Sequence, residues 1–109
     1  MKPVFANPIP IHYYYEPKGD ILYLTFSHET ATKTLEILSD WPLLLADLND
    51  QFQIIGLEYV GFKQFGVETF MQLLRERARK MGIELGDQEV ESLVSFVRRP
   101  EAESALALH

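Results

Sequence analysis

The first sixty residues contain short apolar runs that predict strands rather than helices. Runs of β-branched, aromatic and leucine residues are separated by Pro, Gly, Asn and Asp, which favour turns. The predicted strands cover residues 11–15, 21–26, 30–37, 43–48 and 53–60. Because the turns between them are short, neighbouring strands are expected to be antiparallel. We therefore expect an antiparallel β-meander of four to five strands.

Beyond Gly61 the apolar residues recur every three or four positions, which predicts helices. The longer apolar stripe consists of Val67, Phe70, Met71, Leu74, Ala78 and Met81. Gly82 follows it at the position of a left-handed C-cap, and a shorter helix is predicted over residues 87–98. The predicted fold class is α+β, with the sheet followed by one long and one short C-terminal helix.

The chain of 109 residues has room for one domain. We expect an extended arm over residues 1–10, which contain three prolines, and the antiparallel sheet over residues 11–62. A helical extension over residues 63–98 and a tail over residues 99–109 complete the predicted domain.

Both faces of the predicted strands carry apolar residues. In the second strand, Ile21 and Tyr23 alternate with Leu22 and Leu24. A sheet with one face in water would instead alternate apolar and polar residues, and one long helix can cover only one face. The arm, the second helix or a second copy of the chain has to cover the other face. We favour a second copy, which predicts a homodimer.

Composition and charge narrow the possible functions. The chain has no cysteine, which excludes disulfides, thiolate metal sites and a cysteine nucleophile. Its net charge of −6 disfavours nucleic acid as a partner. No apolar run approaches the roughly 20 residues that span a bilayer, so we expect a cytoplasmic protein. Residues 1–62 carry three Lys and Arg against eight Asp and Glu, which suits a basic protein partner.

Asp20 and Glu58 are the acidic residues that the pattern singles out. Asp20 directly precedes an apolar strand, and Glu58 lies within one. A carboxylate on a partly apolar face needs a partner, and we expect Glu58 to pair with an arginine of the long helix. A small-molecule-binding or hydrolytic site formed by these two carboxylates is the alternative interpretation.

Two further features are candidates for interaction surfaces. Arg75 and Arg79 lie one helical turn apart, in a basic run that includes Arg77. This run is interpreted as the solvated face of the helix, or as a contact for an acidic partner or a nucleic-acid backbone. Trp41, in an apparent turn before Pro42, suits an interface anchor if it is exposed.

Neither a metal site nor a catalytic constellation is predicted. Asp47 and Glu58 have the spacing of the first and last calcium ligands of an EF-hand loop, but Phe52 occupies the position of its glycine. The flanking segments are also strands, so a polar turn is the better interpretation. His12, His28 and His109 lack metal-binding spacing, and no serine lies in a nucleophile elbow. We assign no catalytic, cofactor-binding or metal-binding residue.

Two motifs carry a resemblance to a known family. The stretch from Tyr15 to Leu24, with its Glu-Pro turn and Asp-Ile-Leu-Tyr, resembles the opening of the uncharacterised family catalogued as domain of unknown function 2283. Asp47-Leu48-Asn49 and Ile55-Gly56-Leu57-Glu58 resemble its Asp-x-Asp loop and the strand after it. The likeness covers residues 11–62, with departures at Glu16, Asn49 and Phe52. It implies a binding module, similar to the antitoxin half of small toxin–antitoxin pairs, and no catalytic residue.

The leading hypothesis is therefore a small non-catalytic, antitoxin-like protein-interaction module that forms a homodimer and requires no cofactor. Its surface would bind a further protein, such as a basic one, through the sheet or the helical extension. The alternative is a small-molecule-binding protein or hydrolytic enzyme that uses Asp20 and Glu58.

Overall fold

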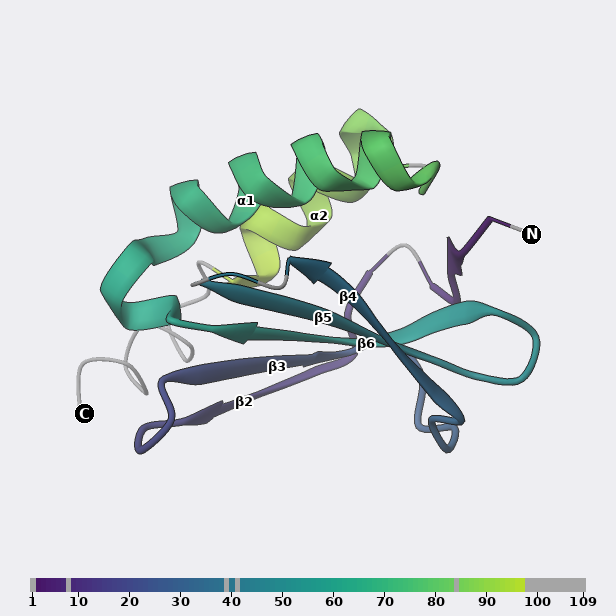
Figure 1. Ribbon diagram of the computed structural model, residues 1–109, viewed down its shortest axis with the longest axis horizontal. Coiled ribbons are helices and arrows are strands. Elements are labelled where there is room, and N and C mark those ends of the chain that lie inside the picture. The colour runs from purple at the N-terminus through teal and green to yellow at the C-terminus, as the bar shows by residue number, and fades with distance from the viewer. Residues whose placement is uncertain (1, 8, 39, 41, 84, 98–109) are drawn as a thin grey trace.

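Six strands form one sheet, and two helices lie on the same side of it, in the part of the chain that the structure describes (Figure 1). This computed structural model describes residues 2–7, 9–38, 40, 42–83 and 85–97. The strands are β1 (Val4–Phe5), β2 (His12–Glu16), β3 (Ile21–Thr25), β4 (Lys33–Leu38), β5 (Leu43–Leu48) and β6 (Gln53–Val60). The helices are α1 (Phe62–Met81) and α2 (Asp87–Val97). The predicted α+β fold class is confirmed.

The strand order is β2-β3-β6-β5-β4, and β1 pairs in parallel with β6. The order departs from a continuous meander in one place, because β3 pairs with β6 rather than with β4. Burial explains the difference. β6 is the longest strand and is mostly buried, so it occupies the centre, whereas β4 exposes Lys33, Thr34 and Glu36 and forms an edge. The predicted arm joins the sheet at Val4–Phe5, and the predicted tail lies outside the described residues.

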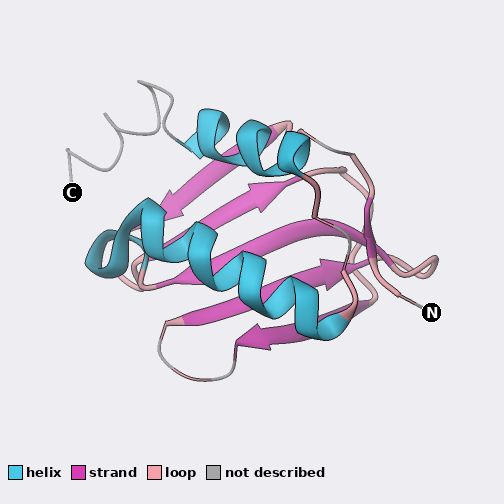
Figure 2. Cartoon of the chain, turned by 90° about the horizontal axis from the view of Figure 1, so that it is seen from above, coloured by secondary structure: helices cyan, strands magenta, loops and turns pink. Residues whose placement is uncertain are grey.

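The core lies between the sheet and the helices. Seen from above, α1 and α2 cross the same face of the sheet (Figure 2). The residues that fill this layer include Leu22, Leu24, Leu44, Ala46, Leu57, Tyr59, Phe70, Leu74 and Leu93, all buried. The Tyr59 ring lies 4.8 Å from that of Phe70, and Tyr13 of β2 meets Phe96 of α2 edge-on at 5.9 Å. The second helix thus covers the face that α1 already covers, and the opposite face stays open.

Helix α1 begins earlier than its apolar stripe. Phe62 to Phe65 form a first turn, and Gly66, at φ 83° and ψ 175°, separates this turn from the rest of the helix. At the other end Gly82, at φ 75°, adopts the predicted left-handed C-cap. Neither helix among the described residues is long and apolar enough to cross a membrane.

Asp20 holds the start of α1. Its main-chain carbonyl accepts hydrogen bonds from the N–H groups of Gly61 at 2.8 Å and Phe62 at 3.2 Å. Its carboxylate accepts from the N–H groups of Lys63 at 2.8 Å and Gln64 at 3.2 Å. The first N–H groups of a helix have no partner within it, and a carboxylate there also favours the helix dipole. Gly61 is the N-cap residue of α1, and Asp20 supplies the acceptors for the first N–H groups from the turn between β2 and β3.

Two further features keep Asp20 in place. The phenol of Tyr15 donates a hydrogen bond to Oδ1 of Asp20 at 2.6 Å. Burial, and next this hydrogen bond, raise the pKa of Tyr15 to about 12, so the phenol remains a donor at neutral pH. The backbone of Asp20 is left-handed, at φ 55°, which Asp and Asn tolerate better than other residues with a Cβ.

We expect Asp20→Ala to destabilise the fold by roughly 2 kcal/mol, because it removes the cap and puts alanine at a positive φ. Asp20→Gly should lose less, since glycine adopts this backbone without strain. Asp20→Asn keeps an acceptor and should be the mildest of the three. Urea unfolding of the four proteins measures the differences. Equal stability of the Asp20→Ala variant and the wild type would contradict the capping role.

Candidate functional site

The face of the sheet opposite the helices carries three rows of side chains across the paired strands. The first row is Glu16, Ile21, Val60 and Leu43. The second is Tyr14, Tyr23, Glu58, Leu45 and Glu36, and the third is His12, Thr25, Gly56, Asp47 and Thr34. The apolar members at the centre, Ile21, Tyr23, Leu43, Leu45 and Val60, are only partly buried. We call these three rows the open face.

Glu58 and Asp47 form a pair of carboxyl groups in the middle of the open face. Glu58 lies between Tyr23 of β3 and Leu45 of β5, and Asp47 lies one row away on β5. The two side chains are hydrogen-bonded to each other. Burial, followed by the hydrogen bond and the negative charge of Asp47, raises the pKa of Glu58 to about 7. At neutral pH Glu58 is therefore protonated in about half of the molecules.

Gly56 makes room for this pair. It lies opposite Asp47 on β6, and a Cβ at this position would lie 3.2 Å from Oδ2 of Asp47. The hydroxyl of Thr34 donates a hydrogen bond to Oδ1 of Asp47 at 3.1 Å and orients it from the other side. A glycine within a central strand weakens the strand, and a close approach of this kind is a common reason for its presence.

A hollow of about 170 Å³ lies beside the pair. Asp47, Gly56, Tyr23, Thr25 and Glu29 are among its lining residues. Glu29 is fixed by hydrogen bonds from the hydroxyl of Ser27 at 2.7 Å and from Nδ2 of Asn49 at 3.2 Å. The hollow is therefore acidic, and the arrangement suits the binding of a cationic group and the exchange of a proton near neutral pH.

The structure does not bring Asp20 and Glu58 together. Asp20 caps α1 on the helix side of the sheet, whereas Glu58 lies on the open face. A pocket shared by these two carboxylates, which the hydrolytic alternative needs, is absent from the described residues. The expected pairing of Glu58 with an arginine of the long helix is wrong for the same reason, since the helix covers the opposite face.

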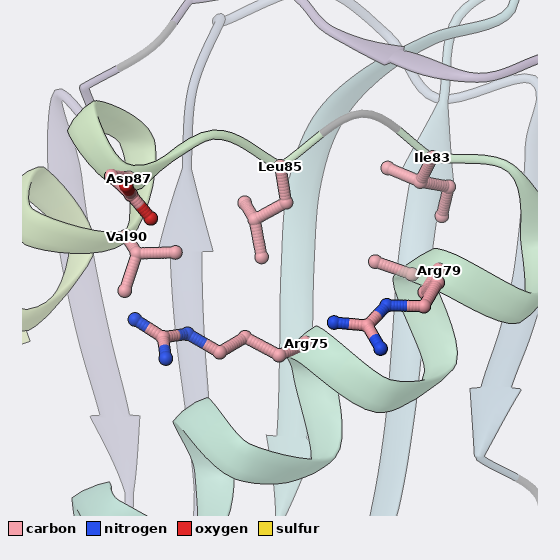
Figure 3. Close-up of a pocket in the computed structure, with 7 residues that line it drawn as sticks. Arg75, Arg79, Ile83, Leu85, Asp87 and Val90 are labelled. Atoms are coloured by element: carbon pink, nitrogen blue, oxygen red, sulfur yellow. The ribbon is translucent and has the colours of Figure 1, made fainter.

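Arg75 and Arg79 line two adjoining hollows between α1 and α2. The first, of about 280 Å³, is bounded by these two arginines with Ala78, Ile83, Leu85, Asp87 and Val90. Figure 3 shows both guanidinium groups extending from α1 into this space. The second hollow, of about 510 Å³, shares Arg75, Arg79 and Val90 with the first. Within the described part of the chain, neither guanidinium group forms an ion pair or a hydrogen bond.

The remaining candidates lie elsewhere. Trp41 and His109 are outside the described residues, so the prediction of an interface anchor at Trp41 stays a prediction. His12 lies on the open face and His28 is exposed after β3. Asn49, third in the calcium-like spacing, is buried, and its Oδ1 accepts hydrogen bonds from the N–H groups of Gln51 and Gln53. No group of three or more acidic or histidine side chains that could hold a metal occurs among the described residues.

Reasoning from the sequence missed the Asp47–Glu58 pair. The signal was present in the register of the hairpin formed by β5 and β6. If Asp47 is placed opposite Gly56, then Glu58 lies two positions along the same face, within reach of its side chain. The calcium-like spacing from Asp47 to Glu58 instead favoured the interpretation of these residues as part of a polar turn between the two strands.

No family model, curated protein or solved structure matches the chain. The resemblance over residues 11–62 therefore stays a prediction.

The raised pKa of Glu58 predicts a pH-dependent stability. Glu58 titrates near 7 in the folded chain against an ordinary value of 4.5, so the folded state binds the proton more tightly. Its contribution to stability is complete below pH 4.5 and is lost as the pH rises through 7. Glu58→Gln removes the ionisation and can still donate a hydrogen bond to Asp47. We expect this variant to unfold a few degrees above the wild type at pH 8.5 and at a similar temperature at pH 4.5.

The matched control is Glu36→Gln, which removes one charge from the exposed edge of the same face. Circular dichroism melting curves across this pH range provide the measurement. If the melting temperatures of wild type and Glu58→Gln run parallel with pH, the carboxyl pair does not titrate as described.

Proposed function

We propose that the protein is a non-catalytic protein-interaction module that binds its partner through the open face. The main observation behind the proposal is that the helices cover only one face of the sheet. Both helices pack on the same face, and the other face keeps a partly buried apolar row formed by Ile21, Val60 and Leu43 (Figures 1 and 2). An uncovered apolar surface of this kind on a small domain marks an interaction site.

The charge of the open face supports a basic partner. Glu16, Glu36, Asp47 and Glu58 lie on the three rows, and none of these rows contains a lysine or arginine. The hollow beside Asp47 adds Glu29 and has room for the end of a basic side chain. A lysine or arginine placed there would gain two carboxylate neighbours, Asp47 and Glu29.

The antitoxin-like function implied by the resemblance is one form of this proposal, in which the basic partner is a toxin. The proposal assigns no catalytic residue, and it places the protein in the cytoplasm, as its composition predicts. The hydrolytic alternative receives little support, because Asp20 serves as a helix cap and not as half of a carboxylate site.

Leu45→Lys tests the open face. The substitution removes an apolar contact from the middle row and presents a positive charge to a basic partner, while Glu58 and Glu36 can accommodate the ammonium within the fold. Gln88→Lys adds the same charge on α2, on the other side of the sheet. We expect tagged wild type and Gln88→Lys to capture the same basic protein from the cells of origin, and Leu45→Lys to lose it.

The captured protein should have a pI above about 8, and purified binding should weaken with salt. Capture of an acidic protein, or equal capture by all three baits, would contradict the assignment of the open face to a basic partner.

A homodimer through the open face is the second candidate, favoured by the same apolar row. The two candidates differ in their pH dependence. Two copies face to face bring two carboxyl pairs close together, so protonation of Glu58 as the pH falls through 7 should strengthen self-association. A basic partner instead prefers both carboxyl groups ionised and should bind more tightly as the pH rises.

Light scattering and sedimentation at pH 6 and pH 8 distinguish the two candidates. Self-association that increases at pH 6, and is abolished by Leu45→Lys, would establish the homodimer. A monomer at both pH values would remove the homodimer and leave the basic partner.

A further inference from the structure

The groove between α1 and α2 is a second surface, on the side of the sheet opposite the open face. It comprises the two adjoining hollows, of about 280 Å³ and 510 Å³, that share Arg75, Arg79 and Val90. Arg75 and Arg79 lie at positions i and i+4 of α1, so they are neighbours on the helix surface. Their guanidinium groups reach across the groove toward the side of Leu85 and Val90 (Figure 3).

The arginines of this groove lack a partner of opposite charge. Neither guanidinium group forms an ion pair or a hydrogen bond with any described residue, although Asp87 lines the same hollow. A guanidinium presents several N–H donors in a planar fork that fits a carboxylate in two parallel hydrogen bonds. Two guanidinium groups one helical turn apart can therefore bind two carboxylates that are also one turn apart on a facing helix.

The rest of the groove combines apolar side chains with the polar Glu68, Gln72, Glu76 and Asp87. Ala78, Ile83 and Val90 are buried at its base, and Leu85 and Val94 are partly buried along it. A long open groove between two helices suits the apolar side of a third helix, whereas a small molecule requires a pocket that encloses most of its surface.

We propose that this groove binds an acidic amphipathic helical segment of a partner protein. Its carboxylates would lie on Arg75 and Arg79, and its apolar side chains would pack on Val90, Leu85 and Ile83. The proposal concerns a different surface from the open face, and neither depends on the other.

A nucleic-acid backbone fits the groove less well. Glu68, Glu76 and Asp87 also line the two hollows, and they would repel a chain that carries a phosphate at every nucleotide. A peptide can place its acids only where the arginines lie and neutral residues beside the glutamates. Charge complementarity therefore favours the acidic peptide.

The experiment selects peptides from a helix-biased display library on the immobilised full-length protein, because no sequence for the partner has to be assumed. We expect the selected peptides to be enriched in Asp and Glu, with apolar residues at spacings of three and four. The strongest of them is then labelled with fluorescein and titrated in anisotropy against wild type, Arg75→Gln/Arg79→Gln and Arg77→Gln/Lys80→Gln.

The second double variant is the matched control. It removes the same charge from the same helix, and neither Arg77 nor Lys80 lines the two hollows. We expect the Arg75/Arg79 variant to weaken binding about tenfold or more, and the control by less than about twofold. Circular dichroism confirms that both variants are folded.

Three results would overturn the proposal. The first is that selection yields no binding peptide, or yields peptides without acidic enrichment. The second is that the two double variants weaken the acidic peptide equally, which would indicate attraction to the net charge of the helix. The third is a fluorescein-labelled single-stranded oligonucleotide that binds through Arg75 and Arg79 more tightly than the selected peptide, which would assign the groove to nucleic acid.

Discussion

The arrangement of sheet and helices depends on the contact between Asp20 and the start of α1. One residue in the turn between β2 and β3 accepts hydrogen bonds from four successive N–H groups, those of residues 61–64. These bonds fix where the chain leaves β6 and enters the helical layer. Gly61 and Gly66, both at positive φ, then let the chain change direction twice within a few residues. Because the cap comes from a distant strand turn, the helix and the β2–β3 hairpin stabilise each other.

The direction set at this junction has a consequence for the sheet. The chain leaves β6 toward one face of the sheet, and both α1 and α2 pack against that face. A connection of only a few residues joins the two helices. The other face receives no helix, and its centre combines apolar side chains with the Asp47–Glu58 pair. Burying a carboxyl pair under a helix would require full desolvation of a charge. On an uncovered face the pair remains partly hydrated, and Glu58 can retain its proton at neutral pH.

Local patterns were sufficient to predict most of the elements. Alternation identified the strands from His12 to Val60, and the stripe from Val67 to Met81 with Gly82 identified the long helix. Contacts between residues that are far apart in the sequence could not be predicted in the same way. The neighbour of β3 is β6, because a long buried strand prefers the centre, and the partner of Glu58 is Asp47 rather than an arginine. Both facts depend on register and on which face a side chain takes, and a shift of one residue would reverse them.

The sequence by itself determined the α+β class, the order of the elements, the acidic strand half and the arginines one turn apart on the helix. These properties are local, because they follow from the periodicity and composition of neighbouring residues. Only the tertiary structure decided that Asp20 is a helix cap, that Glu58 is hydrogen-bonded to Asp47, and that the exposed Arg75 and Arg79 border a groove between the two helices. Each of these roles depends on a residue that is distant in the chain, and the position of that residue is set by the packing of whole elements.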